Sequence, residues 1–598
     1  MVWSDAGVTA PLRERFDRAA AEFPERVRQM DELQHEDEHC LLRLWSACHA
    51  RPEHVQRSDR PPALLAFVGN PTVVGESAAS WPALLQDALN RGVRAVETVW
   101  PPFCAFLRDQ AADTLTIVAD RSALLHLYLR EDPGGTVWAS TSAFALASLG
   151  ADFDLEAATE WATAGHFITG RTFFRGIRQI DCGEVVHLRP GAAPTRTTWV
   201  PTSRGETTAT AYRDAVEEAV GAYSQQEDGL FFEVTGGIDS RLLLAARLRS
   251  GARTRTWTIG QPGDVEMRTV EKLREVATFE HLLVSPDAGF AAELPELIGE
   301  MHALADGEAN AIVYTSLLVA FRELAGVRRT SVTGSNGELA RAFYWRAIAG
   351  GRDTGHVRGV ATDTVVRKIF RESGGLRSVF RRDLPDPEAP VRQAVTDFIR
   401  TSPLQRPSAI LDDFYLRTRM RRFAGRNIST TSLFCAQGVP YFAPSVVDVI
   451  LELPDAQKQD GRVVRETIVE LSPRLGRSGS AAVDRAPLAG RAARDGARVQ
   501  GDGALRRPLR QDARSRPRGL DALSTGRGGR GVPRLRRRPP ADERHTMPRS
   551  LRSRGAADVR TLEPRERIPF AAGARSDDRT DASPVPPWTL IRGPCGGF

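Results

Sequence analysis

The stretch Leu230-Phe231-Phe232-Glu233-Val234-Thr235-Gly236-Gly237-Ile238-Asp239-Ser240-Arg241 decides the fold expected for the second half of this chain. Residues 230–234 are mostly apolar and β-prone, which predicts a short buried strand. Residues 242–248 place leucine and alanine at helical spacing, which predicts a helix. The two glycines between them permit a sharp turn and let an anion approach the backbone N–H groups at the helix start. The stretch therefore predicts a strand, a phosphate-binding turn and a helix.

Asp239 has no obvious role in a pure anion site, but it suits a Mg²⁺ ion that bridges it to phosphates. The competing interpretation is a strand-turn-helix whose glycines only relieve strain. The GxxxxGK[ST] spacing of the P-loop is absent. The hexapeptide resembles the SGGxDS pyrophosphate loop of ATP pyrophosphatases, with threonine in the first position. This resemblance implies that ATP is bound by Thr235, Gly236, Gly237, Ile238, Asp239 and Ser240.

Length and composition indicate a globular protein of two or three domains, with 598 residues and an apolar fraction of 41%. The sequence contains no run of about 18 apolar residues that would predict a membrane span, and no secretory signal is apparent. The six cysteines lie far apart, which favours a reducing cytoplasm over a disulfide framework. Residues 474–598 contain 28 Arg, no Lys and 13 acidic residues, so the remainder, with 53 basic and 62 acidic residues, is acidic.

Residues 1–60 are polar, and we expect them to form a helical N-terminal extension. Their histidines and cysteines fit no standard zinc spacing, so a solvated helix with incidental cysteines is favoured over a metal site. The residues concerned are His35, His39, Cys40, Cys48 and His49.

Residues 61–200 contain short strand candidates separated by turns. Their order resembles the class II glutamine amidotransferase domain, an αββα sandwich of the Ntn type. The matching pieces are Phe106-Leu107-Arg108-Asp109, Ala119-Asp120-Arg121, Trp138-Ala139-Ser140 and Thr172-Phe173-Phe174-Arg175-Gly176-Ile177, with Gly183 beyond.

That family uses an N-terminal cysteine as the nucleophile for glutamine hydrolysis. Val2 stands in second position here, and a valine side chain offers no nucleophile. Cys104 and Cys182 cannot substitute, because the chemistry also uses the free α-amino group as its base. We therefore expect a degenerate domain without glutaminase activity.

Residues 205–473 alternate strands and helices, which predicts a doubly wound parallel sheet with ligands at the carboxyl ends of its strands. A second predicted strand ends at Ile259 and Gly260. The resemblance implies that these two residues contact adenine, whereas the alternative is a strand that simply ends in glycine.

The segment Ser331-Val332-Thr333-Gly334-Ser335-Asn336-Gly337-Glu338-Leu339 resembles the GxGxDE segment of asparagine synthetases. The resemblance implies that Gly334 lies in the ATP site and that Glu338 holds Mg²⁺ together with Asp239. Three departures weaken a strict asparagine-synthetase assignment. Glu338 stands where aspartate is usual, which preserves the charge but extends its reach. Leu339 stands where the second carboxylate would be, and Ser335 and Asn336 replace a glutamate and a glycine.

Residues 439–454 resemble the "VPFLD…LP" stretch of the same family. These synthetases place a lysine shortly afterwards, near the reacting acyl phosphate or adenylate, where a cation offsets developing charge. Lys458 and Arg462 are both candidates for this catalytic role. The Arg/Gly/Pro-rich residues 474–598 are either a disordered basic tail, able to touch nucleic acid electrostatically, or the product of a reading-frame change, which we favour.

The resemblance to asparagine-synthetase-like proteins covers roughly residues 61–475. It implies an ATP-dependent ligase that activates a small-molecule or peptide carboxylate with Mg·ATP for attack by nitrogen, and it leaves room for a separate substrate-delivery protein. An amine already on the substrate can attack, as in the related β-lactam synthetases and lasso-peptide cyclases. The alternatives are a glutamine-hydrolysing asparagine synthase proper and a catalytically dead nucleotide-binding paralogue.

Overall fold

The computed structural model describes residues 1–46, 52–74, 81–198, 207–224, 229–286, 289–325, 329–345, 355–372 and 384–477. The predicted tail over residues 474–598 therefore lies outside the described residues, apart from its first four. Those four belong to a short helix, α18 (Pro473–Arg477), in which Leu475 is fully buried. The folded part of the chain thus continues slightly beyond the predicted boundary at Pro473.

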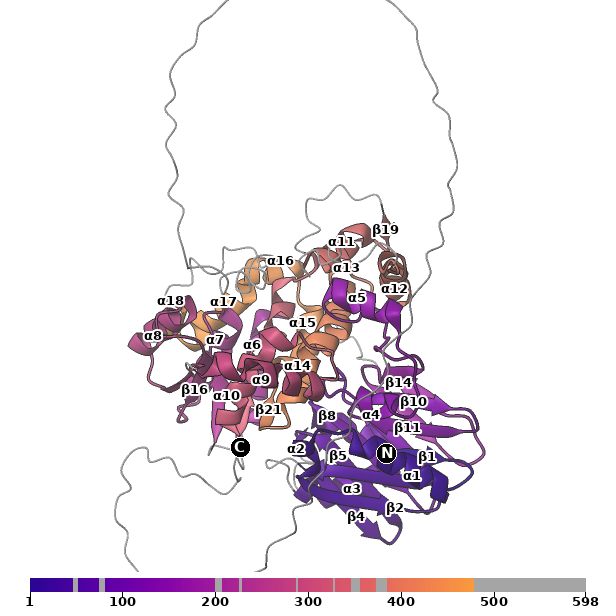
Figure 1. Ribbon diagram of the computed structural model, residues 1–598. Helices are drawn as coiled ribbons and strands as arrows, with labels where there is room; N and C mark the ends of the chain where they lie inside the picture. Colours follow the sequence, from indigo (N-terminus) through magenta and orange to yellow (C-terminus); the bar gives the residue numbers. More distant parts are fainter. Residues whose placement is uncertain are drawn as a thin grey trace, which may run out of the picture. The chain divides into compact units, whose positions relative to one another are not determined.

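The N-terminal part is the predicted αββα sandwich, built on two six-stranded antiparallel sheets (Figure 1). The first sheet has the order β12 (Ile177–Gln179), β10 (Tyr128–Asp132), β11 (Thr136–Ser140), β1 (Val2–Ser4), β3 (Cys40–Ser46), β2 (Asp31–Glu36). The second has the order β14 (Thr195–Thr198), β13 (Glu184–Leu188), β9 (Thr114–Ala119), β8 (Phe103–Asp109), β5 (Pro62–Gly69), β4 (Val55–Asp59).

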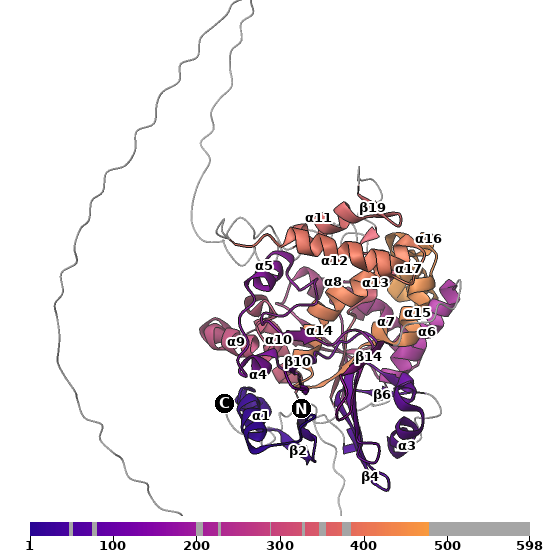
Figure 2. The ribbon, with the colours of Figure 1, turned by 90° about the vertical axis from the view of Figure 1, so that its right-hand side faces the viewer.

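Three apolar clusters define the layers of this sandwich. One lies between the two sheets and joins Trp3 and Leu42 to Phe106 and Ile117. A second packs α3 (Trp81–Arg91) on the second sheet, and a third packs α1 (Ala10–Ala21) and α4 (Ala143–Ala147) on the first. Figure 2 shows α1 and α3 on opposite sides of the sheets. The short remaining elements are α2 (Glu25–Arg28), η1 (Pro52–His54), β6 (Thr72–Val73), η3 (Gly92–Thr98), β7 (Val99–Trp100) and α5 (Leu155–Ala164).

The expectation of a helical extension over residues 1–60 is wrong. β1 pairs with both β3 and β11 inside the first sheet, and β2 and β3 form an antiparallel hairpin. The polar composition misled the prediction because β2 is an edge strand whose side chains are exposed or half-buried. His35 lies in β2 and contacts Asp37, His39 directly precedes β3, and Cys40 is the first residue of β3, so no helix face joins them. Cys48 and His49 lie outside the described residues.

The second part contains the predicted doubly wound parallel sheet, in the order β17 (Glu280–Val284), β16 (Arg255–Ile259), β15 (Leu230–Glu233), β18 (Thr330–Val332), β21 (Ala436–Gly438). β16 and β17 extend the sheet on one side of β15, and β18 and β21 extend it on the other side. The strand order therefore reverses between β15 and β18. Such a switch point is where doubly wound sheets bind ligands, at the carboxyl ends of the strands.

Helices cover both faces of the parallel sheet. The apolar sides of α6 (Ala209–Tyr223), α7 (Ile238–Arg249) and α8 (Val265–Val276) share one cluster with Phe232 of β15. On the other face, α9 (Phe290–Leu304) and α10 (Ala311–Leu324) share a cluster with Trp257 of β16. The central strand is therefore shielded from solvent on both sides, which explains why its sequence is a nearly continuous apolar run.

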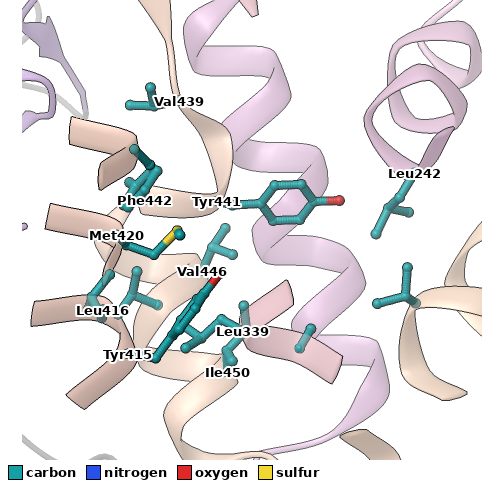
Figure 3. Close-up of a cluster of buried hydrophobic side chains, with 14 of the residues drawn as sticks. Leu242, Leu339, Tyr415, Leu416, Met420, Val439, Tyr441, Phe442, Val446 and Ile450 are labelled. Carbon is teal, nitrogen blue, oxygen red and sulfur yellow. The ribbon is translucent and has the colours of Figure 1, made fainter. Parts of the chain in front are cut away.

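Apart from β21, the residues after β18 add a largely helical layer, from which Arg341 and Tyr441 contact Asp239. Its elements are η4 (Gly337–Arg341), β19 (His356–Val357), β20 (Val360–Ala361), α11 (Thr362–Glu372), α12 (Glu388–Thr401), α13 (Pro407–Tyr415), the π-helix η7 (Leu416–Ala424), α14 (Gly425–Thr431), η8 (Pro440–Phe442), α15 (Pro444–Glu452), α16 (Asp455–Lys458), η9 (Gln459–Gly461) and α17 (Arg462–Leu471). Figure 3 shows side chains of η4, η7 and α15 packed in one cluster, with Leu339 beside Tyr415 and Ile450.

The π-helix η7 also ties this layer to the N-terminal sandwich. Arg421 donates to the carboxylate of Asp181 at 2.6 Å and to the backbone oxygen of Ile180 at 2.6 Å. Nε2 of His126 lies 2.9 Å from the backbone oxygen of Arg421. The backbone N–H of His126 donates to Oγ of Ser429 in α14 at 2.8 Å. These buried polar contacts hold the sandwich and the helical layer together.

Candidate functional site

The turn between β15 and α7 is braced by its own hydroxyl groups. The backbone N–H of Thr235 donates to Ser240 Oγ at 3.1 Å, and the N–H of Gly237 donates to Thr235 Oγ1 at 3.2 Å. The two hydroxyl oxygens lie 3.2 Å apart. Among the described residues, no side chain caps the Gly237 end of α7. The first N–H groups of a helix have no acceptor within the helix, so the start of this 12-residue helix suits an anion.

The turn after β18 packs directly on this first turn. A Cβ atom added at Gly334 would lie 3.0 Å from the backbone nitrogen of Ser240. A Cβ atom added at Gly337 would lie 2.5 Å from both Cβ and Cγ of Asp239. Residue 336 adopts a left-handed conformation with φ of 77°, and its side-chain amide donates to the backbone oxygen of Tyr441 at 2.8 Å. The structure thus brings the two predicted motifs together at the switch point of the sheet.

The carboxylates of Asp239 and Glu338 come from these two facing turns. Oδ2 of Asp239 accepts a hydrogen bond from Nη2 of Arg341 at 2.5 Å, and its backbone oxygen accepts one from the Tyr441 hydroxyl at 2.8 Å. Oε2 of Glu338 is buried and has no hydrogen-bond partner among the described residues. Burial lowers the pKa of the Arg341 guanidinium, but the charges of the Asp239 and Glu338 carboxylates raise it by more. The pKa of Arg341 is therefore above its usual value.

These donors fit a hard divalent cation that is shared with phosphates. Within the described part of the chain, no group of three or more His, Cys, Asp or Glu side chains gathers as a metal site. Mg²⁺ needs no such cage, because it usually takes one or two carboxylates and completes its shell with water and substrate phosphates. The carboxylates of Asp239 and Glu338, which both interact with the charge of Arg341, match that requirement, and Oε2 of Glu338 is buried without a hydrogen-bond partner among the described residues.

Ile259 and Gly260 lie at the same edge of the sheet, where β16 ends next to β15. The backbone N–H of Gly260 donates to the backbone oxygen of Val284 at 3.1 Å. A Cβ atom added at Gly260 would lie 3.3 Å from Oδ2 of Asp264, the residue that precedes α8. Their position agrees with the expected arrangement of strands, and their contact with adenine stays a prediction.

Lys458 and Arg462 lie in different surroundings from the two carboxylates. Lys458 is fully buried, and its Nζ donates to Oδ2 of Asp412 at 2.6 Å. Burial raises the pKa of Asp412, and the charge of Lys458 only partly offsets this effect. Arg462 has a side chain that is 64% exposed and pairs with Glu466 one turn along α17 at 2.7 Å. The structure therefore brings neither side chain to Asp239, and their catalytic role stays a prediction.

Gly461 is the residue of this segment that does reach the site. It has a φ of 66°, and a Cβ atom added to it would lie 3.1 Å from Cγ and Cδ of Arg341 and 3.2 Å from Cδ1 of Ile238. Sequence reasoning missed Gly461, Gly337 and Tyr441 as parts of the site. Of these three, only Gly337 had a usable signal, because it directly precedes Glu338 in the glycine-containing segment 331–339.

The N-terminal sandwich offers no exposed nucleophile at the positions considered. Val2 is completely buried in β1. Burial raises the pKa of the Cys104 thiol well above its usual value and that of Cys182 to about 11, so both thiols stay protonated near neutral pH. These observations agree with the expected lack of glutaminase activity without testing it.

A cavity of about 190 Å³ lies apart from the two glycine turns. Apolar residues of the sandwich line most of it, including Phe16, Leu125 and Trp138, and Asp306 and Arg426 form part of its wall. No residue of 235–240 or 333–341 borders it. This cavity is therefore separate from the candidate site at the two glycine turns.

Comparisons with known proteins find similarity only at the level of structure. No protein-family model matches the chain, and no curated protein matches it. Among the solved structures that match is the glutamine phosphoribosylpyrophosphate amidotransferase from B. subtilis, complexed with ADP and GMP, at 11% sequence identity and a TM-score of 0.17. The match covers 48% of this chain and 64% of that one, so the chain spans less than two thirds of the structure it matches. None of the described helices is long and apolar enough to cross a membrane.

Proposed function

We propose that this chain is an asparagine-synthase-related, ATP-dependent ligase that forms amides by adenylating a substrate carboxylate and releasing pyrophosphate. The observation that carries the proposal is the contact between the two glycine turns. Gly334 lies against Ser240, and Gly337 lies against Asp239, at the switch point of a doubly wound sheet. This arrangement presents helix N–H donors and two carboxylates at one edge of the sheet.

The residues of the chain have separate roles in this proposal. The N–H groups that follow Gly237 bind phosphate oxygens, and the Thr235 and Ser240 hydroxyls keep the turn in shape. Asp239 and Glu338 hold Mg²⁺, which offsets the negative charge that develops on the phosphates as pyrophosphate leaves. The Tyr441 hydroxyl fixes the backbone at Asp239, so its carboxylate keeps one position relative to the turn.

The nitrogen that attacks the activated carboxylate comes from outside the N-terminal sandwich in this proposal. Val2 is buried and apolar, and the thiols of Cys104 and Cys182 are buried and protonated. The substrate is therefore a small molecule or peptide that carries its own amine or receives one from a second molecule, delivered by a separate protein where the substrate is a peptide. The expected location is the cytoplasm.

A catalytically dead nucleotide-binding protein is the second candidate, and the Arg341–Asp239 ion pair favours it. A guanidinium 2.5 Å from Asp239 takes one oxygen that a metal would use. Leu339 removes the further carboxylate expected from the family pattern, because its side chain is buried in the apolar core. Both candidates bind ATP, and only the ligase cleaves its α–β phosphate bond.

Exchange of labelled pyrophosphate into ATP separates the two candidates. We expect exchange that depends on Mg²⁺ and on one carboxylate among a panel that includes aspartate, small amino acids and peptides. Asp239→Asn should abolish it, since the metal and the phosphates lose a shared ligand. Asp214→Asn changes a carboxylate on α6 that is 59% exposed and should leave exchange unchanged. ATP binding without exchange for every carboxylate would support the dead paralogue.

A further inference from the structure

Arg341 and Asp239 form a partly buried ion pair inside the candidate site. The distance between Nη2 of Arg341 and Oδ2 of Asp239 is 2.5 Å, and the two side chains are only 19% and 13% exposed. Charges that are shielded from water in this way interact more strongly than surface charges and are less screened by salt. The pair is therefore a substantial part of the electrostatics of the site.

Arg341 also lies close to Glu338, three residues earlier in η4. The charge of Glu338 contributes to the raised pKa of Arg341, next to that of Asp239. Nε of Arg341 and Oε2 of Glu338 are both buried without a hydrogen-bond partner among the described residues. The cluster thus contains two carboxylates and one guanidinium, and both Nε of Arg341 and Oε2 of Glu338 retain hydrogen-bonding capacity.

The aliphatic part of Arg341 packs closely against Gly461. Gly461 covers its Cγ and Cδ atoms, and a Cβ atom at position 461 would come within 3.1 Å of both. The opposite neighbour of Gly461 is Ile238, in the first turn of α7. The stem of Arg341 is therefore confined, whereas its guanidinium lies at the edge where phosphates are expected.

A metal ion and a guanidinium compete for the same carboxylate oxygen. With Arg341 on Asp239, a divalent cation that arrives alone meets one occupied oxygen and a like charge within a few ångströms. A nucleotide that brings both metal and phosphates removes this conflict, because phosphate oxygens accept guanidinium N–H groups better than a single carboxylate oxygen does.

We propose that Arg341 is a built-in counter-ion that occupies the cation position beside Asp239 and Glu338 until a nucleotide polyphosphate takes it over. This inference rests on the proposed function, because it assigns the polyphosphate to the turn at residues 235–240. It makes metal binding conditional on the nucleotide: Arg341 transfers from Asp239 to a phosphate, and Asp239 becomes a metal ligand. Arg341 is thus a positioning residue that offsets part of the charge of the two carboxylates when no nucleotide is bound.

The test is a Mn²⁺ titration of the full chain, followed by the electron paramagnetic resonance signal of free Mn²⁺. Without nucleotide, we expect weak binding to the native chain and at least about tenfold tighter binding to Arg341→Met, because a buried like charge has been removed. Arg341→Lys keeps a cation and should bind Mn²⁺ as weakly as the native chain. Arg341→Gln repeats the loss of charge with a polar side chain, and far-ultraviolet circular dichroism checks that each variant is folded.

Two controls make the result specific to this site. Arg400→Met removes an arginine of α12 that is 67% exposed, and it should leave Mn²⁺ affinity unchanged. Adding α,β-methylene-ATP should tighten Mn²⁺ binding to the native chain far more than to Arg341→Met, since only the native chain has a guanidinium to displace.

The outcomes separate this inference from the proposed function. Equal Mn²⁺ affinity of the native chain and both neutral variants, with binding still strengthened by the nucleotide analogue, would overturn the counter-ion role and leave the ATP site intact. No Mn²⁺ binding to any variant, with or without the analogue, would overturn the proposed function and the counter-ion role with it.

Discussion

Gly337 lies against the side chain of Asp239, so closely that a Cβ atom at position 337 would come within 2.5 Å of Cβ and Cγ of Asp239. Gly337→Ala must therefore push the two turns apart or displace Asp239. Overpacking of this kind typically costs about 1–3 kcal/mol of unfolding free energy. We expect such a loss in urea unfolding, together with loss of nucleotide binding measured by isothermal titration calorimetry.

Gly299 provides a matched control for this substitution. It lies inside α9, and a Cβ atom there would meet nothing within 4 Å. Gly299→Ala should be neutral or stabilise the chain by up to about 1 kcal/mol, because alanine is the better helix former. If Gly337→Ala were as well tolerated as Gly299→Ala and bound nucleotide normally, the close packing of the two turns would be wrong.

Substitutions in the buried ion pair of Lys458 and Asp412 test whether Lys458 stabilises the fold or acts in catalysis. Both side chains are almost completely buried, at 0% and 1% exposure, and their charged atoms lie 2.6 Å apart. Lys458→Met leaves a buried carboxylate without its cation, and losses of about 3–5 kcal/mol are typical of such changes. We expect this loss in chemical unfolding of the full chain.

The double variant Asp412→Leu/Lys458→Met completes the experiment. If the pair is only structural, the double variant should recover most of the stability that Lys458→Met loses, because both charges are removed together. Pyrophosphate exchange that returns with stability would make Lys458 structural, whereas a stable but inactive double variant would support the role implied by the resemblance. Arg462→Met should cost less than about 0.5 kcal/mol, because its exposed pair with Glu466 is of the weak i,i+4 kind.

The sequence predicted the backbone arrangement at the centre of the candidate site better than the contacts around it. The turn at residues 235–240 and the carboxylate at Glu338 were identifiable because a strand, two glycines and a helix leave little choice of backbone. Their contact followed from the parallel sheet, since turns at the carboxyl ends of adjacent strands must meet. Strands of the sandwich were identifiable as short apolar runs such as residues 64–68, which lie within β5, and the resemblance to an amidotransferase domain implied the αββα arrangement.

The remaining features depend on contacts distant in sequence and had no local signal. Lys458 looked catalytic because it is the single lysine of its segment, yet its partner Asp412 lies 46 residues earlier. β2 looked helical because an edge strand carries few apolar side chains. The pairing of Arg341 with Asp239 joins residues 102 positions apart, and only the folded chain brings them together.

Leu339 is part of the apolar core and cannot simply be exchanged for the carboxylate that the family pattern expects. It is fully buried and lies beside Tyr415 and Ile450 (Figure 3). Leu339→Asp would bury a charge without a partner, so we expect a loss of several kcal/mol or a raised aspartate pKa, and no gain in pyrophosphate exchange. Leu339→Met keeps the volume and should cost less than about 1.5 kcal/mol. A stable, more active Leu339→Asp variant would show that position 339 faces the metal.

Burial of His166 makes part of the chain's stability depend on pH. The side chain is 3% exposed, and burial, reinforced by the charge of Arg419, lowers its pKa to about 3. The unfolded chain binds a proton at this histidine below about pH 6.5, but the folded chain does not until about pH 3. Burial of neutral His166 therefore costs no stability above about pH 6.5. As the pH falls from 6.5 toward 3, the free energy of unfolding decreases by up to about 1.4 kcal/mol per pH unit.

His166→Gln should remove this share of the slope. Urea unfolding at pH 7.5 and pH 5.5 should show a smaller stability difference for the variant than for the native chain. Part of the slope should remain, because burial also lowers the pKa of His126 well below its usual value. His356 is exposed in β19, so His356→Gln should leave the slope unchanged. A slope that is identical in native and His166→Gln chains would mean that this histidine is protonated inside the fold.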